Sequence, residues 1–338
     1  MTSDEIKRDI EEGSLDAADR GKIAPLSQDD MDQLLDIFTN PCRIVGVEPG
    51  NEVFLSDDAS TLRLTVDQGT SGVGIPLGRV QANIVHERAF ANDSIHMGHI
   101  DGSYKAIKAI VPMEQQEIEN LLMNTISPVF YISMPNLGMY YNPDGPYGNP
   151  SDLLPQGKIK EAMEAQEETV ELAVRDIIYI GQSLADIGCD GLNLDTTGAA
   201  GDPDFLATLR VAEELKKTTN LSVEIGMAGE FILGMHGDLK YDGKRLAGMY
   251  PHEQVKVVEK TGTDIYGPVV NTKSSKSSPW NVARAVTFCK ACSEVANIPV
   301  HPNMGMGVGG IPVFETPPID IVTRASKAMV EIGKADGL

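Results

Sequence analysis

Carboxylate and amide side chains recur near the ends of short apolar runs in this sequence, which is where parallel α/β proteins place their active sites. Six of them accompany five such runs: Asp67, Gln68, Asp195, Glu230, Asn271 and Asn303. Any single one could be a cap or a turn residue. The set as a whole is rich in carboxylates and amides and poor in cations, so we expect it to bind a positively charged or amine ligand.

Two glutamates belong together because of strand geometry. Side chains along a strand alternate between its two faces, so Glu224, Gly226, Ala228 and Glu230 would share one face. If Glu230 points into the mouth of a barrel, Glu224 points into the barrel below it, and a buried carboxylate must be paired, hydrogen-bonded or protonated. His236 follows Glu230 by six residues and is expected at the same mouth.

Two other groups of residues raise alternatives. His96 and His99 are three residues apart with Asp101 nearby, so a metal-dependent hydrolase is an alternative function. This spacing is weak, the sequence has no HExxH motif, and we expect no metal among the site residues. Cys289 and Cys292 form one CxxC pair inside a predicted helix, which favours buried packing over zinc or redox chemistry.

The elements that would position these side chains alternate along the chain. Apolar strand candidates occupy 61–68, 106–112, 128–135, 190–197, 222–229, 264–271 and 298–305. Amphipathic helices lie between the later ones, which predicts an α/β fold. Seven strands, with an eighth beginning at Leu338, favour a (β/α)₈ TIM-type barrel, and an open doubly wound sheet is the alternative.

The first 60 residues precede the predicted alternation of strands and helices. Residues 1–60 are expected to form an N-terminal extension, and residues 61–338 an incomplete catalytic barrel that lacks its last strand and C-terminal region. Within the extension, Ser27 followed by acidic residues predicts a capped helix. Two short apolar runs around Pro49-Gly50 predict a hairpin.

Composition limits the class of partner. Asp and Glu total 49 against 28 Lys and Arg, a net charge of −21, so nucleic acid and anionic membranes should be repelled. The sequence has no run of about 18 apolar residues and no signal-peptide h-region. Its four cysteines do not indicate a disulfide scaffold, so we expect a cytoplasmic setting. The acidity fits either a salt-adapted surface or a cation-binding cavity.

Several long blocks of the sequence carry a family resemblance. They include DQGTSGVGIP, HERAF, MPNLGMYYNPDGP, NLDTTGAAGDPDF, EIGMAGE, LGMHGDL, GPVVNTKSSKSS and NMGMGVGGIPVFETPPIDIVTRASKAMVE. In these blocks the chain resembles the dimethylamine:corrinoid methyltransferases. The resemblance implies transfer of a methyl group from dimethylamine to the Co(I) corrinoid of a partner protein, with release of monomethylamine, in methanogenesis from methylamines. It also implies a barrel, a homo-oligomer and no tightly bound cofactor, since the corrinoid belongs to the partner.

The resemblance further implies the amino acid pyrrolysine, encoded by an in-frame amber codon just after Asp336-Gly337-Leu338. Because the sequence stops there, we expect that the amber codon was read as a stop. A barrel without its last strand has unpaired sheet edges, so a truncated and inactive fragment is a further alternative.

The implied chemistry gives the candidate residues their roles. An imine ring accepts the amine after a carboxylate has removed the amine's proton, which requires a general base within hydrogen-bond reach. From strand geometry we assign this base to Glu230, with Glu224 as the second candidate. The expected substrate-binding residues are Asp195, Asn271, Asn303, His236, Asp67 and Gln68.

Overall fold

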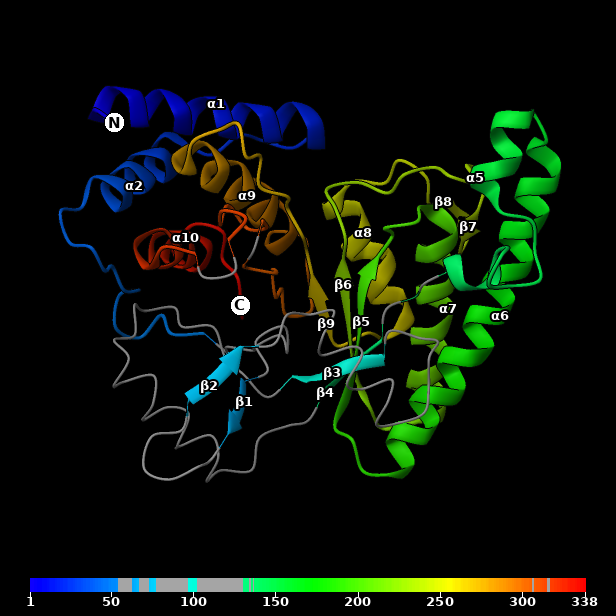
Figure 1. The fold of residues 1–338 in the computed structure, drawn as a ribbon. Coiled ribbons are helices and arrows are strands. Elements are labelled where there is room, and N and C mark those ends of the chain that lie inside the picture. The colour runs from blue at the N-terminus through cyan, green and yellow to red at the C-terminus, as the bar shows by residue number, and fades with distance from the viewer. Residues whose placement is uncertain are drawn as a thin grey trace.

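The computed structural model describes residues 1–53, 63–66, 73–76, 97–101, 130–133, 135, 137–305, 307–314 and 317–338. Its centre is a five-stranded sheet, with the strand order β3 (Met97–Asp101), β4 (Phe130–Ser133), β5 (Gly191–Thr197), β6 (Ser222–Met227) and β9 (Ile265–Gly267). The pairs β4–β5, β5–β6 and β6–β9 are parallel, and β3 is antiparallel to β4. The predicted α/β class is therefore confirmed (Figure 1).

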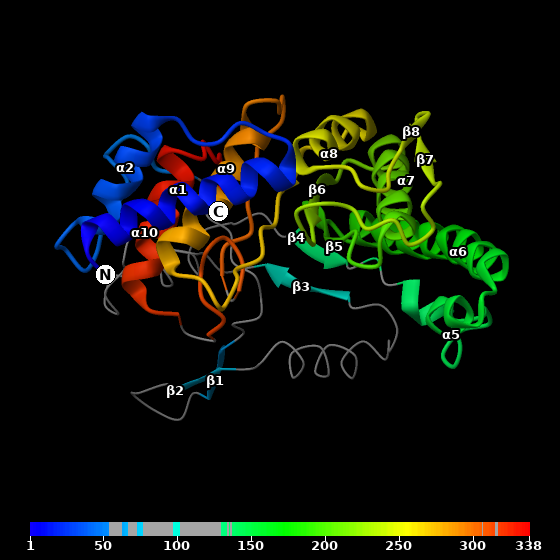
Figure 2. The same ribbon diagram turned by 90° about the horizontal axis from the view of Figure 1, so that it is seen from above.

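Helices follow the parallel strands in sequence. They are α6 (Ile159–Asp186), α7 (Asp202–Thr218), α8 (Pro251–Val258), α9 (Ser278–Ser293) and α10 (Ile319–Glu331), with α1 (Ser3–Gly21) and α2 (Gln28–Thr39) before the sheet. The shorter elements are β1 (Arg63–Val66), β2 (Val73–Pro76), η2 (Leu137–Tyr140), α5 (Pro150–Leu153), η3 (Leu154–Gln156), β7 (Lys240–Tyr241), β8 (Lys244–Arg245) and η4 (Glu259–Thr261). Figures 1 and 2 show α6, α7 and α8 gathered at one end, and α1, α2, α9 and α10 at the other.

The two central strands, β5 and β6, have one apolar and one polar face, which is what positions the site. On the helix-covered face, Leu192 and Leu194 of β5 and Val223 and Ile225 of β6 are fully buried. The residues that alternate with them are polar or glycine, because side chains on a strand point to opposite faces in turn. The polar face is therefore the one available for chemistry.

The parallel arrangement continues past β9. Tyr266 forms a parallel bridge with Val300, and the His301 N–H donates to the Tyr266 carbonyl at 2.8 Å. The Asp336 N–H then donates to the Val300 carbonyl at 2.9 Å. The predicted strand at 298–305 is thus reduced to isolated bridges at Val300 and Gly305, because Pro299 and Pro302 have no N–H to donate.

A closed barrel is not formed by the described residues. Among the described strands, the partner of β1, which lies within the predicted strand 61–68, is β2, and the pair is antiparallel. The predicted strand 106–112 lies outside the described residues. The predictions at 128–135, 190–197, 222–229 and 264–271 correspond to β4, β5, β6 and β9.

The helix predicted after Ser27 forms as α2, but the hairpin predicted after it does not. The Ser27 side chain and Asp30 make the capping box that starts α2. A turn closes between Glu48 and Asn51, yet none of the described residues from 40 to 53 is a strand. The prediction was wrong because this segment docks on α10 instead: the Glu48 N–H donates to Glu331 Oε1 at 2.7 Å, and Lys327 Nζ donates to the Gly46 carbonyl at 2.8 Å.

Among the described residues, none of the helices combines the length and the apolar character needed to span a bilayer.

Candidate functional site

The polar groups on the opposite face of these strands come from Asn193, Asp195, Glu224 and His301, and with Gly226 and Gly267 they form what we call the inner face. Register places Asn193 beside Glu224 on the neighbouring strand. His301, which follows the bridge at Val300, brings its Nδ1 to 2.7 Å from Glu224 Oε1. The residues Asp195 and Glu224 are each only 8% exposed. The inner face therefore holds two buried carboxylates and an imidazole.

Two glycines make room for these carboxylates. A Cβ atom on Gly226 would stand 2.9 Å from Asp195 Oδ1, and one on Gly267 would stand 3.4 Å from Glu224 Oε1. A larger residue at position 226 would crowd Asp195, and a Cβ atom at position 267 would stand 3.0 Å from the His301 carbonyl oxygen. The absence of a side chain at Gly226 thus leaves space for the Asp195 carboxylate.

The end of β5 supplies further polar groups. The Thr196 N–H donates to Asp195 Oδ1 at 2.7 Å, and Thr196 has a φ of 57°, which is a strained conformation for a β-branched residue. Two residues before Asp195 on the same strand, Asn193 Oδ1 is buried and has no hydrogen-bond partner within the described part of the chain. A buried acceptor without a donor is costly unless a ligand or water supplies one.

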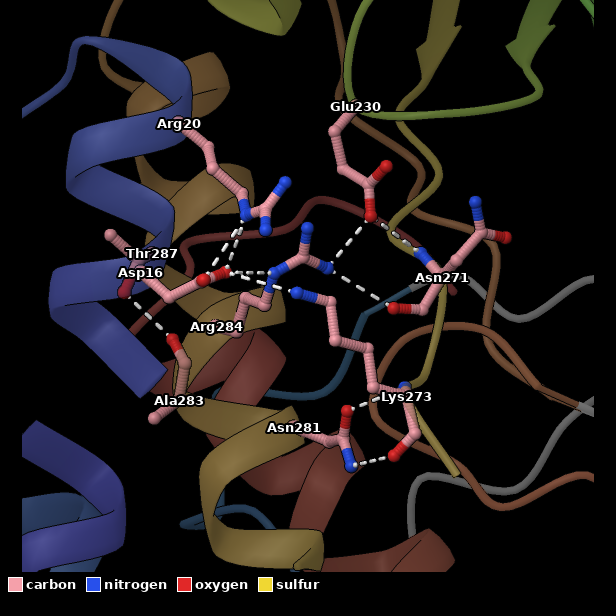
Figure 3. Close-up of polar contacts among 9 residues, drawn as sticks. All are labelled: Asp16, Arg20, Glu230, Asn271, Lys273, Asn281, Ala283, Arg284 and Thr287. Carbon is pink, nitrogen blue, oxygen red and sulfur yellow. Dashed lines mark hydrogen bonds and ion pairs between the residues drawn. The ribbon is translucent and has the colours of Figure 1, made fainter. Parts of the chain in front are cut away.

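Glu230 lies beyond the end of β6 and is held by a different group. Its Oε1 accepts from Arg284 Nη1 at 2.7 Å and from the Asn271 N–H at 3.2 Å (Figure 3). The Arg284 side chain is 3% exposed and that of Glu230 is 14% exposed. Glu230, the predicted general base, is therefore engaged in a mostly buried ion pair, and the structure places the second candidate, Glu224, on the inner face.

The other predicted substrate-binding residues are distributed more widely. Asn271 contacts the Glu230 group through its main chain, and its side chain is exposed. Asn303 is half-buried, and its N–H donates to the Pro268 carbonyl at 3.2 Å. His236 contacts helices α6 and α7, with Nε2 3.0 Å from Glu167 Oε1 and its N–H bonded to Asp202. Asp67 and Gln68 lie outside the described residues.

Sequence reasoning missed three residues of this region: Asn193, His301 and Arg284. For Arg284 a signal exists, because it stands alone in the apolar helix stretch VARAVTF, and a buried arginine requires acidic partners. For His301 the signal is weaker, since it lies two residues before Asn303 in the predicted strand at 298–305. Their partners, 54 and 77 residues away, could not be read from the sequence.

The two alternatives raised by cysteine and histidine have different outcomes. Cys289 and Cys292 are buried in α9 as predicted, and burial raises the pKa of the Cys289 thiol to about 12. In the described part of the chain, no cluster of three or more His, Cys, Asp or Glu residues could hold a metal ion. The side chains of His96, His99 and Asp101 are not among those described.

A buried carboxyl at the start of α7 lies close to the end of β5. Asp204 is fully buried, and its Oδ2 accepts from the Ala200 N–H at 3.2 Å. Its Oδ1 has no partner among the described residues. Burial raises the pKa of Asp204 to about 7, although backbone N–H groups of the preceding loop lower it. The folded protein therefore favours the neutral acid.

This gives a testable pH dependence of stability. The folded-state pKa lies above the unfolded value of 3.8, so the contribution of Asp204 is fully present below that value and is lost as pH rises through about 7. Asp204→Asn imitates the neutral acid. Between pH 4 and 8, the wild type should therefore lose at most about 4 kcal/mol of unfolding free energy relative to D204N. Urea unfolding at a series of pH values measures this difference.

Asp202→Asn is the matched control for this prediction. Both Asp202 oxygens accept backbone N–H groups, from His236 at 2.9 Å and from Gly237 at 2.8 Å. An amide Nδ2 cannot accept a hydrogen bond, so D202N should be destabilised at every pH. Parallel pH curves for the wild type and D204N would contradict the role given to Asp204.

The amino-acid sequence also matches a known protein family. The family model described as "Dimethylamine methyltransferase (Dimeth_PyL)" matches residues 1–338. No solved structure matches the chain.

Proposed function

The chain belongs to the dimethylamine methyltransferase family, and from this premise we propose that it transfers a methyl group from dimethylamine to the Co(I) corrinoid of a partner protein, releasing monomethylamine. The observation that carries the proposal is the pair of buried carboxylates, Asp195 and Glu224, on the inner face beside His301. The proposal places the reaction in methanogenesis from methylamines, as the resemblance implies.

The inner face suits a secondary ammonium ion. Dimethylamine is protonated at neutral pH and then carries two N–H donors and one positive charge. Asp195 and Glu224 offer two acceptors on adjacent strands, and Asn193 Oδ1 adds a third, buried acceptor to which none of the described residues donates. Two carboxylates in a mostly buried setting attract a cation much more strongly than they would in water.

Within this site, we assign proton removal to Glu224. His301 Nδ1 contacts Glu224 Oε1 at 2.7 Å and so fixes the carboxylate in one orientation. Gly267 leaves the space in which that carboxylate lies. Asp195, held by the Thr196 N–H at 2.7 Å, then faces the remaining positive charge. Most of the rate enhancement would come from this positioning and charge stabilisation.

The family resemblance adds pyrrolysine to this site, following Leu338. Asp336 hydrogen-bonds to Val300, so the segment 336–338 runs beside the one that carries His301. The residues present fit such a group by their chemistry, because Asp195 and Glu224 are buried carboxylates on this face and Asn193 Oδ1 is a buried acceptor with no donor among the described residues. When present, pyrrolysine would supply an electrophilic imine carbon for the amine. Glu224 would remove the proton of the amine, and Asp195 would face the remaining positive charge.

We also propose the wider organisation that the family implies. The methyl acceptor is a small corrinoid protein, the enzyme is a homo-oligomer, and the fold is an eight-stranded barrel to which residues 1–60 are an extension. Two features support this: Val300 forms a parallel bridge with Tyr266 of β9 and accepts a hydrogen bond from the Asp336 N–H, and α1 packs on α9 while α2 packs on α9 and α10.

The proposed function is tested with the native protein, dimethylamine and the partner corrinoid protein reduced to Co(I). Methyl-Co(III) formation, followed by its visible absorption, and monomethylamine release should rise together. Monomethylamine and trimethylamine serve as controls and should react far more slowly, because they carry three and one N–H donors when protonated. Equal rates with all three amines, or no methyl-cobalt with dimethylamine, would overturn the proposal.

A further inference from the structure

A buried arginine connects the N-terminal helix to two loops beside the inner face. Arg284 of α9 donates from Nε to Asp16 Oδ2 of α1 at 2.8 Å. Its Nη1 donates to Glu230 Oε1 at 2.7 Å and to the Asn271 carbonyl at 3.1 Å. Glu230 follows β6, and Asn271 follows β9. One guanidinium thus joins α1, α9 and both loops (Figure 3).

The residues around Arg284 make further contacts with one another. Asp16 also accepts from Arg20 Nε, and Lys273 Nζ lies 3.5 Å from it. Burial opposes the ionisation of Asp16, but the hydrogen bonds from Arg20 and Arg284 outweigh it and hold its pKa below the usual value. The Lys273 main chain is fixed by Asn281 of α9, which accepts from its N–H at 2.8 Å and donates to its carbonyl at 3.0 Å.

Arg284 is suited to this task because of its shape and surroundings. Its guanidinium presents several N–H donors in a rigid plane, which lets one residue hold a carboxylate on each side and a carbonyl. The aromatic rings of Phe288 and Trp280 lie 5.3 and 6.0 Å from the guanidinium carbon and pack against it. A lysine would offer a single charged point on a flexible stem.

The loop held by Glu230 has an exposed apolar segment. Phe231, Leu233 and Met235 are 43%, 48% and 42% exposed, directly after the residue that Arg284 holds. The position of Glu230 therefore fixes the base of this segment relative to β6. The inner-face residues are held separately, since Glu224 is paired with Asn193 within the sheet and Asp195 accepts from the Thr196 N–H at 2.7 Å.

We propose that Arg284 is a positioning residue of the methyl transfer, oriented by Asp16 of α1, which holds the loops after β6 and β9 in their working arrangement. This inference rests on the proposed function. It makes the N-terminal helix part of the active-site structure. It also gives Glu230 a role as an anchor for the loop and leaves proton removal to Glu224.

The variants Arg284→Met, Arg284→Lys and Asp16→Asn test the proposal. R284M removes every polar contact and should lower the saturated rate about 100-fold. R284K keeps a charge but not the planar fork, and should lose about 10-fold. Half-saturation by dimethylamine should stay unchanged in R284K and D16N, because the sheet holds the inner face. Lys276→Met, an exposed residue over the same Trp280 ring, is the control and should match the wild type.

Two measurements need no substrate. The Asn271 N–H is bonded to Glu230, so its hydrogen exchange should accelerate in R284K and D16N. The emission of Trp280, the one tryptophan in the sequence, should shift in R284K and R284M but not in a variant remote from α9. If the native protein transferred no methyl group, the proposed function would fail, and these two measurements would still decide whether the network exists.

A double-mutant cycle separates positioning from general stability. Asp16 and Glu230 do not contact each other but share Arg284. D16N and E230Q should therefore be non-additive in the Asn271 exchange rate, and should become additive when Arg284 is replaced by methionine. Additivity in the wild-type background, or unchanged exchange and rate in R284K, would overturn the proposal. A raised half-saturation for dimethylamine at an unchanged saturated rate would overturn it as well.

Discussion

Glutamine in place of Glu224 is expected to slow methyl transfer from dimethylamine by about 10²- to 10⁴-fold, the usual cost of removing a general base. The amide keeps the shape of the side chain and can still bond to His301, but it cannot accept a proton. Glu224 is 8% exposed, and its contact with His301 is 2.7 Å, so little else in the site should move. The loss should therefore fall on the chemical step.

The measurement is single-turnover methyl-cobalt formation across a range of pH. Glu230→Gln is the matched comparison, because it makes the same change six residues away. It keeps an acceptor for Arg284 and for the Asn271 N–H and should lose only about 10-fold, as expected for a weakened positioning contact. If E230Q lost more than E224Q, the proton acceptor would be Glu230, as strand alternation alone predicts.

The two glutamates differ in whether strand alternation can predict where their side chains point. Alternation correctly places Glu224 and Gly226 on one face, because both lie within β6. It cannot place Glu230, because β6 ends at Met227 and the following residues have no strand geometry to repeat. Beyond that point the position of the side chain is set by Arg284, which comes from a helix 54 residues later.

The strands themselves were predictable where their hydrogen bonds are regular. The apolar residues of β5 and β6 are buried on the helix side, and this pattern is visible in the sequence. The sequence overestimated β9, which stops at Gly267 because Pro268 has no N–H to continue the ladder. It also treated the first 60 residues as peripheral, although Asp16 holds Arg284, since no local pattern reports a contact across 268 residues.

Gly13 of α1 lies where even one added methyl group is expected to lower the stability of the fold substantially. A Cβ atom there would stand 2.2 Å from the Trp280 carbonyl oxygen, with the Trp280 carbonyl carbon at 3.0 Å and Cα at 3.1 Å. These are backbone atoms at the start of α9, so they cannot rotate away. Alanine normally stabilises a helix by about 1 kcal/mol relative to glycine. Gly13→Ala should instead cost about 2–3 kcal/mol, because α1 must move off α9.

Urea unfolding of G13A measures this cost, and Gly181→Ala is its matched control. Gly181 also lies inside a helix, but its Cβ would meet only the tips of the Leu215 side chain, at 2.6 and 2.7 Å, which can shift. G181A should therefore be close to neutral, and G13A strongly destabilised; a neutral or stabilised G13A would contradict the close approach of the two helices. Asp16 follows Gly13 by almost one helical turn, so displacing α1 would also withdraw the carboxylate that orients Arg284. The surviving folded G13A protein should then show the faster Asn271 exchange expected for D16N, because the same contact is lost by a different route.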